Sequence, residues 1–130
     1  MIIPTVTPLY AGILALFLVY LSFQVIFRRK SAKVSLGDGD DSLLNKRIRV
    51  HANFVEYAPI GLILLLMAEL QGAPLWVCHI LGLMLVAGRV MHAHGLAADP
   101  QIIPLRKNGM IITFAMLTFA AIANIAHAIF

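Results

Sequence analysis

The sequence predicts an all-α integral membrane protein, folded as a four-helix bundle that forms a single domain over residues 1–130. Hydrophobic residues make up 61% of the chain and charged residues only 12%, a composition far from that of soluble globular proteins. Four apolar stretches reach the ~20 residues that a helix needs to cross a bilayer core of ~30 Å. The basic residues behind the formal charge of +4 lie beside these stretches, which indicates a lipid bilayer as the partner and argues against nucleic acid.

The first span is expected over about residues 5–27, which contain no charged residue. A basic cluster at 28–30 follows it. With no basic residue before the span and no small-residue cleavage site after it, we expect a retained anchor and not a removable signal peptide. The polar segment Ser31–Lys46 contains two glycines and three aspartates, so we expect a flexible loop there without a fold of its own.

The second and third spans are expected over about 49–70 and 74–94. Gln71 and Gly72 form a helix-ending pair between them, and Pro74 suits the first turn of the next helix. Because this connection is very short, the two helices are predicted to be antiparallel neighbours.

Glycine and proline residues separate the third span from the fourth. Gly95 is expected to end the third helix, and Pro100 and Pro104 interrupt the chain before a fourth span over about 105–129. Trp76, at the far end of the third span, fits an interfacial aromatic belt.

The basic residues also predict the orientation of the bundle. All of them lie on the side that carries the first and third loops, so the positive-inside rule places that side in the cytoplasm and both termini outside it. A bacterial inner membrane is the expected location. The ten residues are Arg28, Arg29, Lys30, Lys33, Lys46, Arg47, Arg49, Arg89, Arg106 and Lys107.

Polar residues inside a predicted span are expensive in lipid, so each one is a candidate functional residue. Arg49, Asn53, Glu56 and Tyr57 occupy positions i, i+4, i+7 and i+8, which places them on one stripe of the second helix. They can contact one another or share a ligand. A structural ion-pair network that holds helices together is an equally good interpretation of the same pattern.

Two further arginines lie near helix ends. Arg89 lies near the end of the third span, where an arginine commonly extends to the lipid headgroups. Arg106 follows Pro104 at the start of the fourth span, where free backbone N–H groups and the helix dipole favour an anion. Arg106 is therefore a candidate to hold a thiolate or carboxylate; the alternative is another cation at the membrane surface.

The cysteine and the histidines predict no metal site. Cys78 is the only cysteine, which excludes an intrachain disulfide, and no Cys/His spacing resembles a zinc site. His92 and His94 are two residues apart and point to opposite sides of a helix. His79 and His127 both lie towards the outer face, where a bis-histidine haem site is an alternative, but packed or interfacial histidines are the default.

The segment from Arg49 to Pro59 resembles the signature of the MAPEG family, the membrane-associated proteins of eicosanoid and glutathione metabolism. The pattern is an arginine, three residues, an asparagine, two residues, Glu-Tyr and a nearby proline. Gln24–Arg29, Gly88–Gly95 and Pro104–Gly109 are similar to further family segments in the same order. The resemblance therefore covers nearly the whole chain, with a likeness to microsomal glutathione transferases.

This resemblance implies a homotrimer that binds glutathione as co-substrate between adjacent subunits near the cytoplasmic helix ends. Arg106 matches the arginine assigned to thiolate activation. Arg29, or Arg28 if the register shifts by one, matches a basic first-helix residue near the substrate. His92 stands where the family often has a tyrosine, and Leu96 where a further aromatic is expected. The matched glutathione contacts are Arg49, Asn53, Glu56, Tyr57 and Arg89.

The chemistry of glutathione fits these residue types. The molecule carries two carboxylates and one ammonium, which suit several arginines and the single carboxylate of Glu56. An arginine at a helix N-terminus stabilises the thiolate, the nucleophilic form of a thiol whose free pKa is about 8.5. The predicted function is a membrane-bound glutathione transferase or glutathione-dependent peroxidase that acts on a hydrophobic electrophile. The alternatives are a non-catalytic protein of the same fold and a small four-span transporter.

Overall fold

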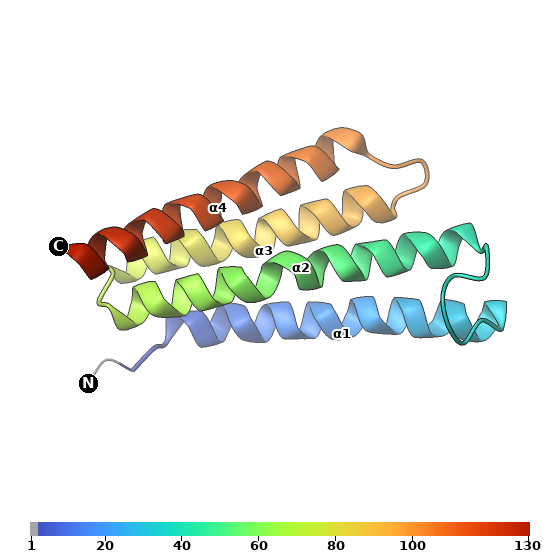
Figure 1. The fold of residues 1–130 in the computed structure, drawn as a ribbon, viewed down its shortest axis with the longest axis horizontal. Helices are drawn as coiled ribbons and strands as arrows, with labels where there is room; N and C mark the ends of the chain where they lie inside the picture. Colours follow the sequence, from blue (N-terminus) through green and yellow to red (C-terminus); the bar gives the residue numbers. More distant parts are fainter. Residues whose placement is uncertain (1–2) are drawn as a thin grey trace.

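The computed structural model describes residues 3–130 and is all-helical over that range, as predicted (Figure 1). Each of the four helices is long and apolar enough to span a membrane. The chain runs up and down, so that both ends of the chain lie at one end of the bundle (Figure 1). The helices are α1 (Val6–Ala32), α2 (Ser42–Leu70), α3 (Leu75–Ala97) and α4 (Ile103–Ile129).

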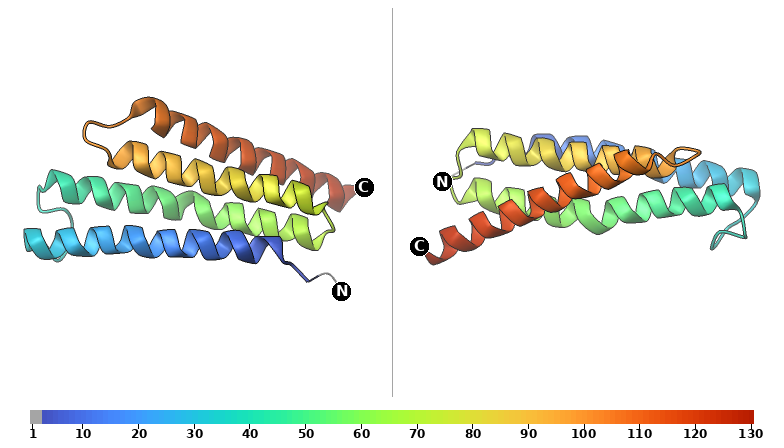
Figure 2. Two further views of the ribbon diagram at one scale, coloured as in Figure 1. Left: turned by 180° about the vertical axis from the view of Figure 1, so that it is seen from behind. Right: turned by 90° about the horizontal axis from the view of Figure 1, so that it is seen from above.

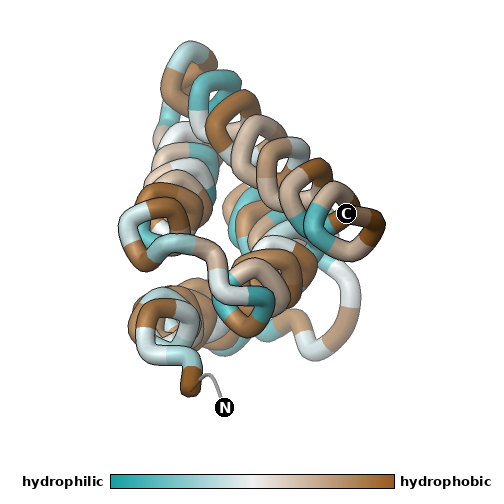
Figure 3. The backbone as a smooth tube through the Cα atoms, turned by 90° about the vertical axis from the view of Figure 1, so that its left-hand side faces the viewer, coloured by the Kyte–Doolittle hydropathy of each residue, from teal (hydrophilic) through white to brown (hydrophobic). Residues whose placement is uncertain are grey.

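The helices do not contact one another equally. α2 and α3 each pack against all three other helices, whereas α1 and α4 make no helix contact with each other over the described residues. α4 crosses the others obliquely (Figure 2). Buried Leu14, Leu65, Leu85 and Met116 belong to the core between the helices. Many large apolar side chains are exposed, and apolar segments recur along the helices (Figure 3), which suits a lipid environment.

The connection between α1 and α2 corrects the expectation of a flexible loop over Ser31–Lys46. Both flanking helices extend into this segment, α1 to Ala32 and α2 back to Ser42. Asp41 is the N-cap of α2, because its carboxylate accepts a hydrogen bond from the Leu44 N–H at 2.7 Å. At the other side, Lys33 adopts a left-handed conformation that ends α1. Local capping therefore decides these boundaries, and apolar content does not.

Gly95 does not end α3, which continues to Ala97. The glycine is instead required by a close approach of α4: a Cβ atom at this position would lie 2.5 Å from the backbone nitrogen of Arg106. The Gly95 carbonyl also accepts a hydrogen bond from the Ile102 N–H at 3.0 Å. This residue is a packing position between the two helices, and the chain turns only after Ala98.

Two more glycines bring α3 and α4 into backbone contact. A Cβ at Gly88 would meet the Gly109 carbonyl oxygen at 2.9 Å, and a Cβ at Gly109 would meet the backbone nitrogen of His92 at 2.5 Å. Small residues at such positions are the usual means by which membrane helices approach closely. Gly88 and Gly109 therefore permit the close approach of α3 and α4.

At the end that carries both termini, polar side chains join the helices. The buried carboxylate of Glu69 on α2 accepts hydrogen bonds from the N–H groups of Thr5, Val6 and Thr7 at 2.7, 2.8 and 2.7 Å. It thereby satisfies N–H groups that the first turn of α1 leaves unpaired. His79 on α3 is hydrogen-bonded to the hydroxyl of Tyr10 at 3.0 Å, as the default interpretation of the histidines expected.

Candidate functional site

The most deeply buried charge in the bundle is Arg89 of α3, whose exposure is 1%. Its Nε and one terminal nitrogen donate to the hydroxyl of Thr113 on α4 at 3.0 and 2.8 Å. The other terminal nitrogen donates to the side-chain oxygen of Asn53 on α2 at 2.8 Å. The guanidinium carbon lies 5.0 Å from the centre of the Tyr57 ring, in a cation–π arrangement. Arg89 therefore does not extend to the headgroups.

No carboxylate among residues 3–130 lies within ion-pair distance of Arg89. A buried charge is costly without partners, so the neutral groups around it supply the compensation. The Thr113 hydroxyl accepts from the arginine and donates to the Gly109 carbonyl at 2.9 Å, which leaves it fully satisfied. Arg89 is in this way a polar junction that joins α2, α3 and α4 at one depth.

The predicted stripe on α2 divides into two pairs. Asn53 and Tyr57 face the other helices: both contact Arg89, and Tyr57 packs edge-on against Phe114 of α4 with ring centres 5.6 Å apart. Arg49 and Glu56 contact each other at 3.8 Å, and their side chains are 58% and 50% exposed on the single chain. The Arg49–Glu56 pair lies within α2 and joins no two helices, whereas Asn53 and Tyr57 link α2 to α3 and α4.

An open cavity of about 580 Å³ lies beside this junction, between α2, α3 and the first turns of α4. Three of the predicted site residues line it: Asn53 from α2, His92 from α3 and Arg106 from α4. His92 is buried, whereas Arg106 is exposed and donates one hydrogen bond, to the side-chain oxygen of Gln101 at 2.9 Å. The remaining lining residues are Ile103, Lys107, Met110, Ile111 and Phe114.

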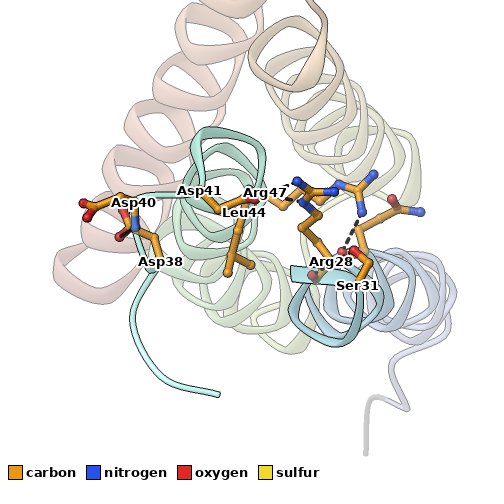
Figure 4. Close-up of polar contacts among 8 residues, drawn as sticks. Arg28, Ser31, Asp38, Asp40, Asp41, Leu44 and Arg47 are labelled. Carbon is orange, nitrogen blue, oxygen red and sulfur yellow. Dashed lines mark hydrogen bonds and ion pairs between the residues drawn. The ribbon is translucent and has the colours of Figure 1, made fainter. Parts of the chain in front are cut away.

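The arginines at the end of α1 do not line this cavity in the single chain. Arg29 donates to the carbonyl oxygens of Gly37 and Val34 at 2.7 and 3.5 Å, and so holds the α1–α2 connection. Arg28 pairs with Asp41 through two hydrogen bonds of 3.0 and 2.6 Å (Figure 4). Arg28 and Arg29 were the two candidates for a basic first-helix residue near the substrate, and both bind groups of the α1–α2 connection instead.

Sequence reasoning missed Thr113, Met110 and Phe114. All three lie on α4 in the eight residues that follow Arg106, and Thr113 is the principal partner of Arg89. The available signal was spacing: Arg106, Gly109 and Thr113 are at i, i+3 and i+7, on one face of the helix. Within the described part of the chain, no cluster of His, Cys, Asp or Glu has the arrangement of a metal site.

Four long apolar helices, with a buried arginine between them and an open cavity at one end, are the features of a polytopic membrane protein. The chain belongs to the MAPEG family, whose sequence profile matches residues 7–126. This confirms the family that the motifs predicted. The chain is also 41% identical over 120 residues to the inner membrane protein YecN of Escherichia coli K12, a match that covers 92% of this chain and 90% of the relative. The protein of the same name from Escherichia coli O6:H1, strain CFT073, is similar to the same extent.

Proposed function

We propose that the protein is a glutathione-dependent transferase or peroxidase that acts on hydrophobic electrophiles dissolved in the bilayer. The observation that carries this proposal is the convergence of Asn53, His92 and Arg106 on one cavity. Its volume of about 580 Å³ lies within the range of small-molecule sites. Its position beside lipid-facing helices gives an apolar substrate direct access from the membrane.

Arg106 is the residue proposed to hold the thiolate. Over the described residues its side chain has a neutral partner, Gln101, and no carboxylate neutralises its charge. It lies in the first turn of α4, where the helix dipole adds to the positive potential. Both effects favour the thiolate over the thiol and so lower the pKa of the bound sulfur.

Asn53 is proposed to contact glutathione directly, and Arg89 to support the site through it. At 1% exposure the guanidinium of Arg89 has little access to a ligand, and it holds the Asn53 side chain at 2.8 Å. Arg49 and Glu56 supply the guanidinium for a carboxylate and the carboxylate for the ammonium. In the single chain these two charges satisfy each other.

The exposed Arg49–Glu56 pair supports assembly into a homotrimer. Glu56 is about 10 Å along the helix axis from Arg49 at 1.5 Å per residue, a depth at which a charge facing lipid is expensive. A neighbouring subunit that covers this face removes that cost and closes the glutathione site. The trimer itself follows from the family resemblance.

The cavity is proposed to face the cytoplasm of a bacterial cell. Apart from any near the helix centres, all basic residues lie at the end of the bundle that carries the cavity. The relatives from Escherichia coli are named inner membrane proteins. This orientation places the site at the glutathione pool of the cytosol.

Turnover of a general apolar electrophile by purified protein tests the role of Arg106. For Arg106→Leu we expect turnover to fall about 100-fold, as on loss of one preorganised electrostatic stabiliser, with a smaller change in glutathione affinity. Activity should recover at higher pH, where more of the bound thiol ionises. Ultraviolet absorbance of the thiolate reports its pKa directly. Lys30→Leu, which removes an exposed charge elsewhere, is the matched control and should leave turnover unchanged.

Glu56→Gln separates binding from chemistry, because the ammonium it is proposed to hold takes no part in the reaction. We expect weaker glutathione binding and nearly unchanged turnover at saturation. Equal turnover in wild type and Arg106→Leu would refute the assigned role. An inactive wild type would favour a non-catalytic member of the family, an alternative that the mutual pairing of Arg49 and Glu56 supports.

A further inference from the structure

A second cavity, separate from the candidate glutathione site, borders α1 and not α4. It has a volume of about 270 Å³ and is enclosed by α1, α2 and α3 near the α1–α2 connection. It shares no lining residue with the first cavity. The lining residues are Phe17, Tyr20, Leu21, Gln24, Leu43, Lys46, Arg47, Val50, Val90, Ala93, His94 and Ala97.

The lining changes character along the helices. Towards the middle of the bundle it is apolar, with Phe17 and Leu21 on α1 and Val90 on α3. Towards the connection it is polar and basic, with Lys46 and Arg47 on α2. This gradient matches an amphiphile that has an apolar tail and an anionic head.

The two cations are not neutralised by buried carboxylates over residues 3–130. Arg47 donates to the backbone oxygen of Gln24 at 3.0 Å and has no carboxylate within 4 Å. Lys46 donates to the Ala98 carbonyl at 3.0 Å, and the carboxylate of Asp99, 4.0 Å away, is 96% exposed. An ion pair at such an exposed group contributes little.

A second acidic group near this end of the cavity, Asp41, is already paired with another arginine. Asp41 pairs with Arg28 and caps α2 through Leu44, while Arg47 lies beside this pair (Figure 4). Three of the roughly four accepting positions of the Asp41 carboxylate are therefore occupied. The basic end of the cavity retains a net positive charge.

We propose that this cavity binds an anionic phospholipid, with its phosphate at Lys46 and Arg47 and one acyl chain along the apolar lining. Both cations lie in the first turns of α2, at the end of the bundle where the basic residues gather, and basic pockets between membrane helices at this level bind anionic headgroups. The volume of about 270 Å³ is slightly below the usual range of ligand sites, so the cavity holds part of one acyl chain, and the rest of the lipid stays in the bilayer. The site is independent of the proposed glutathione chemistry.

Lipid binding to delipidated protein in detergent, followed by native mass spectrometry, tests this proposal. Dimyristoyl phosphatidylglycerol and dimyristoyl phosphatidylcholine are compared because they share acyl chains and differ in net charge. We expect the anionic lipid to bind at least five-fold more tightly, on the basis of the contribution of one basic residue near an anionic headgroup. Glycerol 3-phosphate, which carries the head without a chain, should bind far more weakly than the lipid.

Variants locate the binding. Arg47→Gln should weaken phosphatidylglycerol binding about five-fold and leave phosphatidylcholine binding unchanged. Lys33→Gln removes an exposed charge outside the cavity and is the matched control, expected to change neither. Val90→Trp fills the groove from its partly exposed rim and should weaken both lipids, which tests the site even if Arg47→Gln does not fold.

Three results would overturn the proposal. The first is equal binding of the two lipids by the wild type. The second is an equal loss for Lys33→Gln and Arg47→Gln, which would indicate diffuse attraction to the basic surface. The third is unchanged lipid binding in Val90→Trp.

Discussion

Replacing Thr113 with valine removes the hydroxyl that Arg89 depends on and keeps the shape of the side chain. Two hydrogen bonds from the guanidinium, at 3.0 and 2.8 Å, lose their acceptor in a site where the arginine is 1% exposed. Side-chain hydrogen bonds in membrane proteins contribute about 0.6 kcal/mol on average and up to about 1.7 kcal/mol, and bonds to charged groups lie at the upper end. We therefore expect Thr113→Val to lower the free energy of unfolding by about 2–3 kcal/mol.

Thr113→Ser retains the hydroxyl and loses one methyl group, so it should cost only about 1 kcal/mol. The decisive comparison is a double-mutant cycle with Arg89→Met. Removing the arginine as well leaves no unpaired buried donor, and apolar replacement of a buried polar network is often nearly neutral. The double variant should then recover about 2 kcal/mol relative to the sum of the single variants.

The assay is reversible unfolding in mixed micelles with increasing dodecyl sulfate, followed by circular dichroism. A Thr113→Val protein as stable as the wild type, or a coupling energy of zero within error, would refute the account of Arg89 as a junction satisfied by neutral partners. A large loss for Thr113→Ser would show that packing, and not the hydroxyl, stabilises this position.

Three further predictions follow from the same structure. Gly95→Ala places a Cβ 2.5 Å from the Arg106 backbone nitrogen and should cost about 1–3 kcal/mol in the same assay, whereas Gly12→Ala, with no atom within 4 Å, should be neutral or stabilising. The hydrogen bonds from Arg28 and from the Leu44 N–H hold the pKa of the Asp41 carboxyl below its usual range, so the stability they confer is present above about pH 4 and is lost as the pH falls through the lowered pKa. The melting temperatures of wild type and Asp41→Asn should therefore differ at neutral pH and converge in acid; a constant difference would contradict this. A C-terminal alkaline phosphatase fusion, active only outside the cytoplasm, should be active, and activity of a cytoplasmic reporter there would reverse the orientation.

The four helices could be predicted because the bilayer leaves a chain of this composition few options. Every backbone N–H and carbonyl in lipid must be paired within the segment, so apolar stretches of sufficient length become helices. This constraint does not decide where each helix ends. There, the Asp41 cap and the left-handed Lys33 set the boundaries, and a sequence scan for apolar content passes over both. Gly95 shows the same limit, since a glycine that ends a helix and one that packs against a neighbour look alike in sequence.

The candidate site could be predicted only in part because a helical stripe has width. At about 100° per residue, Arg49 and Glu56 are about 20° apart around the axis, whereas Asn53 and Tyr57 lie about 40° and 80° beyond Arg49 on the other side. α3 and α4 cover only the edge that carries Asn53 and Tyr57. The edge with Arg49 and Glu56 is left as an exposed surface. Thr113 was not predicted because a threonine in an apolar helix commonly bonds its own backbone, and nothing in the sequence pairs it with Arg89.

The Glu69 carboxylate has a consequence for how the protein is made. The amides it binds belong to residues synthesised 62 to 64 positions earlier, which lie beside it at the open end of the α1–α2 hairpin. While the nascent chain is shorter than this, the first turn of α1 lacks its acceptor, and α4, which makes no helix contact with α1, does not supply one later. The first turn of α1 can therefore gain these hydrogen bonds only after α2 has been synthesised as far as its last turn.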